Sequence, residues 1–214
     1  MKPLFITGIG TGIGKSLVSA ILVQALEAEY WKPVQAGLAD GTDTAFVQQY
    51  SNIASQQHKE TYRLQLPASP HIAARAEGLR ISLDTIAADY QAIMANASRS
   101  HYLVIEGAGG LMVPLNENEF VIDLIKKLQA RVVLVSRNYL GSINHSLLTA
   151  AACKANGIDV AGWVFNDQYM QYEQEIAEWT GYPVLASIPL LQPLSSAAIR
   201  EQAMRIKQNL LKYL

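Results

Sequence analysis

The sequence lacks several features that define specialised classes of protein. Its single cysteine, Cys153, excludes an internal disulfide framework and a cage of cysteine metal ligands. The 17 basic and 18 acidic residues nearly cancel to a net charge of −1, so no global field recruits nucleic acid or an anionic membrane. There is no uninterrupted apolar run of about 18 residues, and no basic segment precedes an apolar stretch at the N-terminus. We therefore expect a cytoplasmic protein that binds neither nucleic acid nor membrane.

What the sequence does contain is a regular alternation of apolar runs and helical patterns. Half of its residues are hydrophobic and only 16% are charged, which is enough for one well-filled core. Nearly all-apolar runs of this kind form parallel strands that are covered on both faces. We expect such strands at 4–7, 30–37, 101–106, 131–136, 160–166 and 183–189, and helices at 15–29, 43–50, 82–98, 119–129, 142–156, 169–180 and from 196. Segment 51–80 is the least regular.

This alternation predicts the fold class. Strands that alternate with helices form right-handed crossovers, and so an α/β fold with a doubly wound, mostly parallel sheet and helices on both faces. No repeat, low-complexity segment or linker interrupts the chain. We expect residues 1–214 to form a single domain.

The opening segment 5–16, FITGIGTGIGKS, indicates a phosphate-binding loop. Backbone N–H groups of such a loop and the N-terminus of the following helix bind phosphates. Lys15 would reach the β- and γ-phosphates, and the Ser16 hydroxyl would ligate Mg²⁺. The usual pattern has four residues before Gly-Lys-Ser, whereas five lie between Gly8 and Gly14 here. The alternative is a tight turn with a surface lysine, which the flanking strand and helix disfavour.

Three charged residues follow other expected strands or precede helices. Lys32 alone would be a solvated side chain, but two lysines near a triphosphate neutralise the charge of a transferring phosphoryl group. Asp43 and Glu106 together with Ser16 would offer oxygen ligands to a hard cation. Asp43 alone is better explained as a helix cap, for which Thr42 is the other candidate. Glu106 is harder to explain in that way, because a carboxylate that closes a buried strand needs a partner or an ion.

Two further segments carry weaker signals. Gly141 and Ser142 precede a helix whose free N–H groups could bind an anion, while His145 inside that helix is explained at least as well by packing. Asn166 and Asp167 follow a strand, where they would suit the edge of a purine or an ordinary turn.

Taken together, the motifs resemble those of the dethiobiotin synthetase family. In family order they are TGIGTGIGKS, KPVQAG, TDT, SPH, EGAGG, LGSINHSLLT, GWVFND and IPLL, and they span almost the whole chain. The family's phosphate loop has the same extra residue. The resemblance implies a P-loop NTPase-like fold and a homodimer. It also implies an ATP- and Mg²⁺-dependent ring closure that joins 7,8-diaminononanoate and CO₂ through a carbamate and a carbamic-phosphoric anhydride.

The same resemblance implies roles for individual residues. Lys15 and Lys32 match the catalytic lysines, and Ser16, Asp43 and Glu106 match the Mg²⁺ ligands. The matching nucleotide contacts are Gly12, Ile13, Gly14, Lys15, Ser16, Leu17, Asp43, Glu106, Gly107, Ala108, Gly109, Asn166, Asp167, Pro189, Leu190 and Leu191. The matching substrate contacts are Thr11, Lys32, Ala36, Leu140, Gly141 and Asn144, with 140–145 reached across the dimer.

The chain departs from the family pattern in its substrate and adenine contacts. Ala36 replaces a serine or threonine of many members, which removes a side-chain contact to the substrate. QPLSS follows IPLL where relatives carry a glutamate, so one adenine contact is in doubt and discrimination between nucleoside triphosphates could be looser.

A rival interpretation is a nucleotide-switch ATPase of the septum- and chromosome-positioning type. Those proteins have a lysine early in the loop, where Gly10 stands here. Their membrane-binding members end in a basic amphipathic helix, and segment 199–214 has such a composition. Docking of that helix on the sheet with its basic face in water explains the pattern better.

Overall fold

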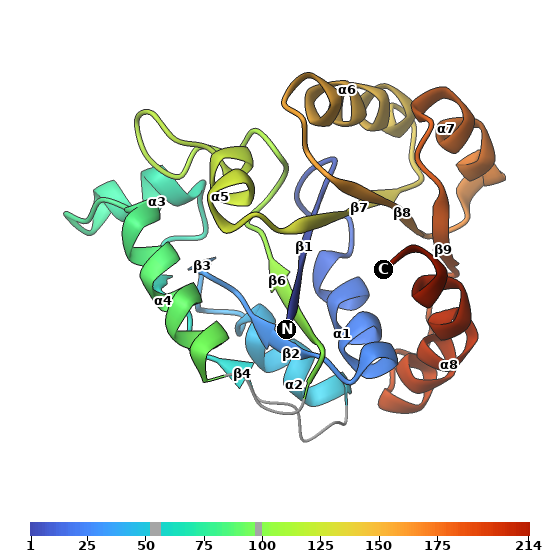
Figure 1. Ribbon diagram of the computed structural model, residues 1–214, viewed down its shortest axis with the longest axis horizontal. Helices are drawn as coiled ribbons and strands as arrows, with labels where there is room; N and C mark the ends of the chain where they lie inside the picture. The colour runs from blue at the N-terminus through green and yellow to red at the C-terminus, as the bar shows by residue number, and fades with distance from the viewer. Residues whose placement is uncertain (52–56, 97–99) are drawn as a thin grey trace.

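A seven-stranded sheet crosses the molecule in the computed structural model, which describes residues 1–51, 57–96 and 100–214 (Figure 1). Its order is β4-β2-β6-β1-β7-β8-β9, and its paired strands are parallel. The strands are β1 (Lys2–Gly8), β2 (Glu29–Trp31), β4 (Gln57–His58), β6 (Tyr102–Glu106), β7 (Arg131–Arg137), β8 (Val160–Asn166) and β9 (Val184–Ile188). The chain places β2, β4 and β6 on one side of β1 and then β7, β8 and β9 on the other. The predicted doubly wound parallel sheet is therefore confirmed.

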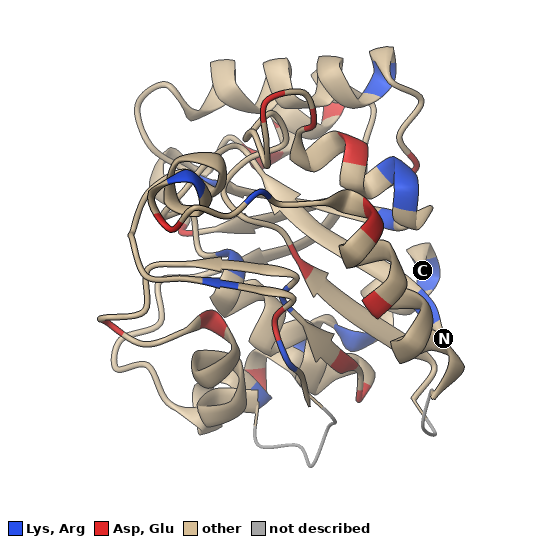
Figure 2. Cartoon of the chain, turned by 90° about the vertical axis from the view of Figure 1, so that its left-hand side faces the viewer, with Lys and Arg blue, Asp and Glu red and all other residues tan. Residues whose placement is uncertain are grey.

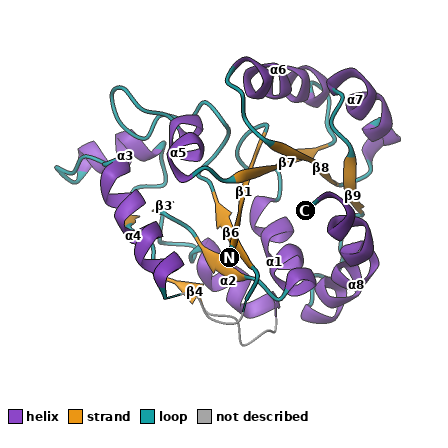
Figure 3. Ribbon diagram, viewed as in Figure 1, coloured by secondary structure: helices purple, strands orange, loops and turns teal. Residues whose placement is uncertain are grey.

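Helices cover both faces of this sheet (Figures 1 and 3). One face packs against α1 (Lys15–Leu26), α2 (Asp43–Ser51) and α8 (Ser196–Tyr213), and the other against α4 (Leu83–Ala95), α5 (Val121–Leu128), α6 (Ser142–Ala155) and α7 (Glu173–Thr180). Successive strand side chains point to opposite faces. Accordingly Leu4 and Ile6 lie in the core beside α1, whereas Phe5 lies in the core on the opposite face.

The predicted strand over 30–37 is wrong in one respect, because it is two strands in two sheets. The chain leaves the large sheet after Trp31 and enters a two-stranded sheet of β3 (Val34–Ala36) and β5 (Tyr62–Leu64). Pro33 has no N–H for a strand ladder, and its carbonyl accepts a 3.0 Å hydrogen bond from the backbone N of Tyr62. Lys32 therefore lies at the point where the two sheets separate.

Segment 51–80 is more regular than expected where the structure describes it. It contains β4, β5 and α3 (Pro70–Ala76), which packs on the small sheet. Residues 52–56 lie outside the described part. Proline at the first helical position after Ser69 is a start signal that the sequence reading did not use.

The other helices agree closely with their predicted spans. α1 ends at Leu26, three residues before the expected end. α4 is capped by the Ser82 hydroxyl, which accepts from the Thr85 N–H, and the predicted positions 97 and 98 lie outside the described residues. The helix expected at 169–180 is divided into a 3-10 turn at Tyr169–Gln171 and α7, because Met170 has a positive φ of 56°.

The charges of the two signs are mixed over the molecule, as the near-zero net charge suggests. Lysine, arginine and acidic residues are interspersed along the elements in Figure 2. Among the described residues, each helix is too short or too polar to cross a membrane.

Candidate active site

The loop between β1 and α1 is held in place by its own glycines. Gly12 and Gly14 have φ of 73° and 90°, a region that L side chains rarely adopt. A Cβ at Gly14 would lie 2.0 Å from the Asn166 amide nitrogen, which itself donates to the carbonyl of Ile13 at 3.1 Å. Asn166, predicted as a nucleotide contact, thus fastens the loop to the end of β8.

Lys15, the first residue of α1, lies back over this loop. Its ammonium donates to the carbonyl of Gly10 at 2.7 Å, and the residue is only 7% exposed. Burial lowers the pKa of Lys15 to about 8, and the negative charge of Glu106 offsets part of that effect. Near neutral pH the lysine keeps its proton, at an energetic cost that an anion on the loop would relieve.

Four polar side chains from different elements meet beside the loop. The Ser16 hydroxyl hydrogen-bonds to Asp43, and it lies 3.0 Å from Oε1 of Glu106. Lys32 Nζ lies 2.8 Å from Asp43 Oδ2 and 3.2 Å from Glu106 Oε1. Lys32 and Glu106 are 4% and 1% exposed. We call Ser16, Lys32, Asp43 and Glu106 the charged cluster.

The charges within the charged cluster stabilise one another. Burial by itself would lower the pKa of Lys32, but the carboxylates of Glu106 and Asp43 outweigh it and raise that pKa overall. Burial likewise opposes the ionised form of Asp43, yet Lys32 and the Ser16 hydroxyl hold its pKa below the usual range. Lys32 and Asp43 are therefore both in their charged forms.

Neighbouring residues cap α2 and hold the Asp43 backbone, so the Asp43 carboxylate is available to the charged cluster. The Thr42 hydroxyl accepts from the N–H of Ala45 at 3.1 Å, so Thr42 caps α2 and the alternative that Asp43 is only a cap is wrong. The side-chain carbonyl of Gln35 accepts from the Asp43 N–H at 3.1 Å. The sequence reading missed Gln35, for which it has no signal beyond one polar residue in an apolar run.

Tyr30 is a second residue that the sequence reading missed. Its hydroxyl donates to Oε2 of Glu106 at 2.9 Å, and its side chain is fully buried. Burial raises the pKa of Tyr30 well above its ordinary value, and the charge of Glu106 raises it further, so the phenol stays protonated. A usable signal was its spacing, because Tyr30 and Lys32 are two residues apart in an extended segment.

The loop and the charged cluster open into a cleft of about 850 Å³. The predicted site residues that line it are Thr11, Gly12, Gly14, Lys15, Ser16, Leu17, Lys32, Ala36, Asp43, Glu106, Ala108 and Gly109. Ile13 and Gly107 do not line it but lie behind its surface, where their carbonyls accept from Asn166 and Lys32. Residues 67–70 form part of the wall, and they include the Ser-Pro of the SPH motif.

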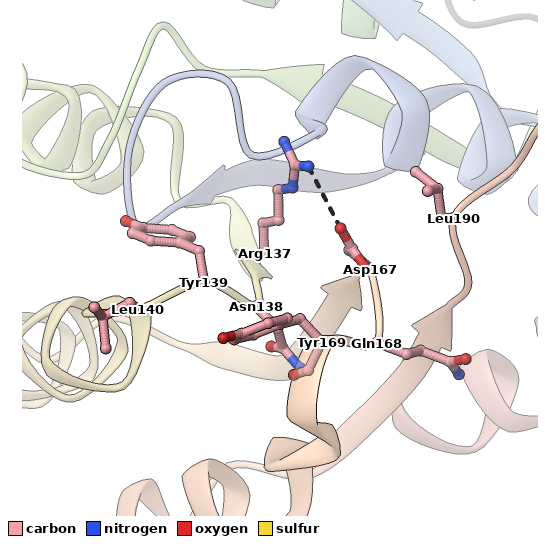
Figure 4. A pocket seen from close by; sticks show the side chains of 8 residues that line it. All are labelled: Arg137, Asn138, Tyr139, Leu140, Asp167, Gln168, Tyr169 and Leu190. Carbon is pink, nitrogen blue, oxygen red and sulfur yellow. Dashed lines mark hydrogen bonds and ion pairs between the residues drawn. The ribbon is translucent and has the colours of Figure 1, made fainter.

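Asp167 and Leu190, two of the residues predicted at the base end, line a different hollow, of about 530 Å³ (Figure 4). It is lined by Arg137, Asn138, Tyr139, Leu140, Asp167, Gln168, Tyr169 and Leu190. Figure 4 shows Arg137 from the end of β7 reaching Asp167 after β8, with 3.4 Å between Nη2 and Oδ2. Pro189 and Leu191 are not among the lining residues, although they adjoin Leu190 in the chain.

Two predicted substrate contacts lie in neither hollow. Gly141 and Asn144 are exposed at the start of α6, beside Leu140, whose side chain is 94% exposed. A single chain therefore does not bring residues 140–144 to the cleft that holds the charged cluster.

The charged cluster fits a hard divalent cation. The Ser16 hydroxyl is hydrogen-bonded to one oxygen of Asp43 and one of Glu106, so three oxygens lie close together beside the phosphate loop. Within the described residues, no group of three or more His, Cys, Asp or Glu side chains could hold a metal by itself. Such a site needs further oxygens from phosphate and water, which is how Mg²⁺ is usually bound beside nucleotides.

Comparison with known proteins gives a family and a fold. A family model described as an AAA domain matches residues 2–198. The chain is 43% identical to the ATP-dependent dethiobiotin synthetase BioD of Cytophaga hutchinsonii and 41% identical to that of Christiangramia forsetii, over 98% of each chain in both cases.

Solved structures with the same fold are far more distant in sequence. The MinC:MinD cell division complex of Aquifex aeolicus aligns with a TM-score of 0.59, at 11% identity, over 99% of this chain and 95% of the other. The MinD protein of Pyrococcus horikoshii, solved with Mg-ADP, aligns with a TM-score of 0.57 at 13% identity, over 98% of this chain and 93% of the other. At such identities the likeness concerns the fold alone.

Proposed function

The chain belongs to the dethiobiotin synthetase family, and on that premise we propose that it closes the ureido ring of dethiobiotin in an ATP-dependent reaction. The proposed substrates are 7,8-diaminononanoate, CO₂ and ATP. The observation that carries the proposal is the convergence of Lys15 and the charged cluster in one cleft. Paired lysines beside a phosphate loop suit the transfer of a phosphoryl group.

The proposed reaction has three steps. One amine of the substrate attacks CO₂ and loses a proton, which gives a carbamate. A carbamate oxygen then takes the γ-phosphoryl group of ATP, and the bond between that group and ADP breaks. Finally the second amine attacks the carbamate carbon and loses a proton, and phosphate leaves with the electrons of the C–O bond. A carbamate is a poor electrophile, so the phosphoryl transfer supplies the leaving group that ring closure requires.

The chain's own residues would hold and neutralise these anions. Lys15 would exchange its bond to the Gly10 carbonyl for the phosphates, and Lys32 would face the carbamate from the other side of the cleft. Fixed charges in a buried site stabilise developing charge without reorganisation. Mg²⁺, held by Ser16, Asp43 and Glu106 together with the phosphates, would supply charge neutralisation of the triphosphate.

The remaining expectations extend this proposal. We propose that the base of ATP lies against Asp167 and Leu190 in the hollow of Figure 4, and that Ala36 contacts the substrate through its backbone. We also propose a homodimer of single-domain subunits in the cytoplasm, in which 140–144 of one subunit complete the substrate site of the other. The exposure of the apolar Leu140 supports that arrangement.

The test is product formation by the purified protein. We expect dethiobiotin, identified by mass spectrometry, only when diaminononanoate, bicarbonate and Mg-ATP are all supplied. Each omission serves as a control. ATP turnover that continues without a ureido product would contradict the proposal.

Nothing in the structure favours the nucleotide-switch alternative. The MinD-type structures share the fold at 11–13% identity, whereas relatives named as synthetases share over 40% across the whole chain. Gly10 stands in the position of the switch ATPases' lysine, and its carbonyl accepts a hydrogen bond from Lys15 of the same chain.

A further inference from the structure

Glu106 has a hydrogen-bond partner on each of its two oxygens. Oε1 faces the cleft, where it lies 3.0 Å from the Ser16 hydroxyl and 3.2 Å from Lys32 Nζ. Oε2 faces the core and accepts from the Tyr30 hydroxyl at 2.9 Å. The two oxygens therefore have different surroundings: Oε1 faces the groups of the cleft, and Oε2 faces a tyrosine in the core.

The strand register explains why the tyrosine lies behind Glu106. β2 and β6 pair in parallel with Tyr30 beside Val104, and side chains two residues apart in a strand share a face. Tyr30 and Val104 lie in the core next to α1, whereas Trp31 lies in the core on the opposite face. Glu106, two residues after Val104, follows on the α1 side, where the phenol reaches it.

A role in packing alone does not account for this tyrosine. A phenylalanine would fill the same volume, but a buried hydroxyl and a buried carboxylate oxygen each require a partner. Tyr30 is fully buried and Glu106 is 1% exposed, so water does not reach the pair freely. Each group meets the requirement of the other.

We propose that Tyr30 is a positioning residue for the reaction: its hydroxyl fixes the Glu106 carboxylate so that Oε1 is presented to Ser16, Lys32 and the divalent cation that accompanies the nucleotide. The inference rests on the proposed function for the identity of that nucleotide. Tyr30 itself does not line the cleft and would touch neither substrate nor cation. Its effect passes through the orientation of one carboxylate.

The informative substitution is Tyr30→Phe, which keeps the ring and removes only the donor. Outer partners of a metal ligand typically contribute a factor of about 10 or more to metal affinity. In the presence of saturating ADP, we expect the variant to bind Mn²⁺, as a probe for Mg²⁺, about tenfold more weakly than the wild type. Electron paramagnetic resonance measures the free Mn²⁺ directly. Binding of ADP without any divalent ion should be unchanged, because the hydroxyl that is removed is bonded to Glu106 and not to the loop.

Tyr90→Phe is the matched control. Tyr90 is also a core tyrosine, 6% exposed, but it stacks on Trp31 in the opposite core, with ring centroids 6.4 Å apart. Removing its hydroxyl should leave Mn²⁺ binding unchanged. A loss of Mn²⁺ affinity equal to that of Tyr30→Phe would indicate a general loosening of the core and would overturn the proposal.

A double-mutant cycle with Glu106→Gln locates the effect. If Tyr30 acts through Glu106, then Tyr30→Phe costs little further Mn²⁺ affinity once Glu106 has been replaced, whereas full additivity would contradict the proposal. Tyr30→Phe by itself leaves a buried carboxylate oxygen unpaired and could prevent folding. In that case recovery of the fold in the double variant supports the pairing. Failure of both variants to fold would show that the hydroxyl serves the fold independently of Glu106, which would overturn the proposal.

The experiment separates this inference from the proposed function. If the wild type binds Mn²⁺ with ADP but forms no dethiobiotin, the proposed function is wrong. The double-mutant cycle would still test the role of Tyr30, because it measures only Mn²⁺ binding. A wild type that forms dethiobiotin while Tyr30→Phe binds Mn²⁺ normally would sink the positioning role alone.

Discussion

The two ends of the nucleotide-binding edge differ in how tightly their charges are held. At the phosphate end Lys15, Lys32 and Glu106 are 7%, 4% and 1% exposed, and each is hydrogen-bonded. At the base end the Arg137 and Asp167 side chains are 46% and 23% exposed, and they meet at 3.4 Å. Fixed buried charges stabilise a reacting group far more than exposed ones. We therefore expect the chemistry to occur at the phosphate end and the base end to contribute only weaker recognition.

Among the substitutions considered, we expect replacement of Lys32 at the phosphate end to have the largest effect on activity. Lys32→Ala leaves the half-buried Asp43 and the buried Glu106 without their shared cation, and it removes the charge that we propose faces the carbamate. We expect turnover to fall by about 10²–10³-fold, the range seen when one stabilising donor is removed from an active site. Steady-state phosphate release measures the effect.

Lys207→Ala serves as the control, because Lys207 lies in α8 and forms an exposed ion pair with Glu27. Its turnover should match the wild type. A near-normal Lys32→Ala enzyme would return Lys32 to a structural role.

Gly14→Ala tests how far the loop depends on its backbone. A Cβ there would strain a left-handed residue, at about 1–2 kcal/mol, and would also collide with the Asn166 amide. Gly157→Ala is the matched control, since it has a φ of 64° but open space around its Cβ. Denaturant titration should show a clearly larger loss of unfolding free energy for Gly14→Ala, together with weakened ADP binding. Equal losses would show that the contact with Asn166 is unimportant.

The pKa of Lys15 gives the phosphate end a pH dependence. Below about pH 8 the free protein already carries this proton, so ADP affinity should be flat. Above that pH a neutral Lys15 must take up a proton on binding, and affinity should fall about tenfold per pH unit. Calorimetric titration between about pH 7 and 9, roughly one pH unit on either side of that pKa, measures it. Lys15→Arg stays charged and should lack the inflection; its presence there would assign the titration elsewhere.

The smallest effect is expected at the base end. Exposed ion pairs contribute about 0–1 kcal/mol, so Arg137→Ala should change ADP affinity by about fivefold at most. Competition binding with ADP, GDP and CDP measures both affinity and selectivity. If Arg137→Ala lowered ADP affinity by about 10²–10³-fold, the factor expected for the turnover of Lys32→Ala, the two ends would not differ as proposed.

The meeting of the loop, Lys32 and Glu106 in one cleft was predictable because its signals are local. Apolar runs end at Glu106 and just before Lys32, and Gly-Lys-Ser marks the loop, so a parallel sheet brings these residues together. Tyr30 and Gln35 escaped prediction because their roles depend on which face a strand presents and where the small sheet lies. The division of 30–37 into two strands was missed for the same reason.

The base end and the substrate tail were less predictable. The positive φ values at Asp167 and Met170 break the chain after β8 in a way that no residue pattern announces. Residues 140–144 stay away from the cleft of their own chain, so their proposed role depends on a second copy. Only an assembled dimer could test that part of the resemblance.

The central claim is that the phosphate end couples ATP cleavage to ring closure. The most direct measurement supplies ¹³C-bicarbonate with diaminononanoate and Mg-ATP, and follows labelled product by mass spectrometry alongside released phosphate. The account predicts dethiobiotin labelled at its ureido carbon in equal amount to the phosphate released, with both products lost together in Lys32→Ala. Phosphate release without labelled dethiobiotin would contradict it.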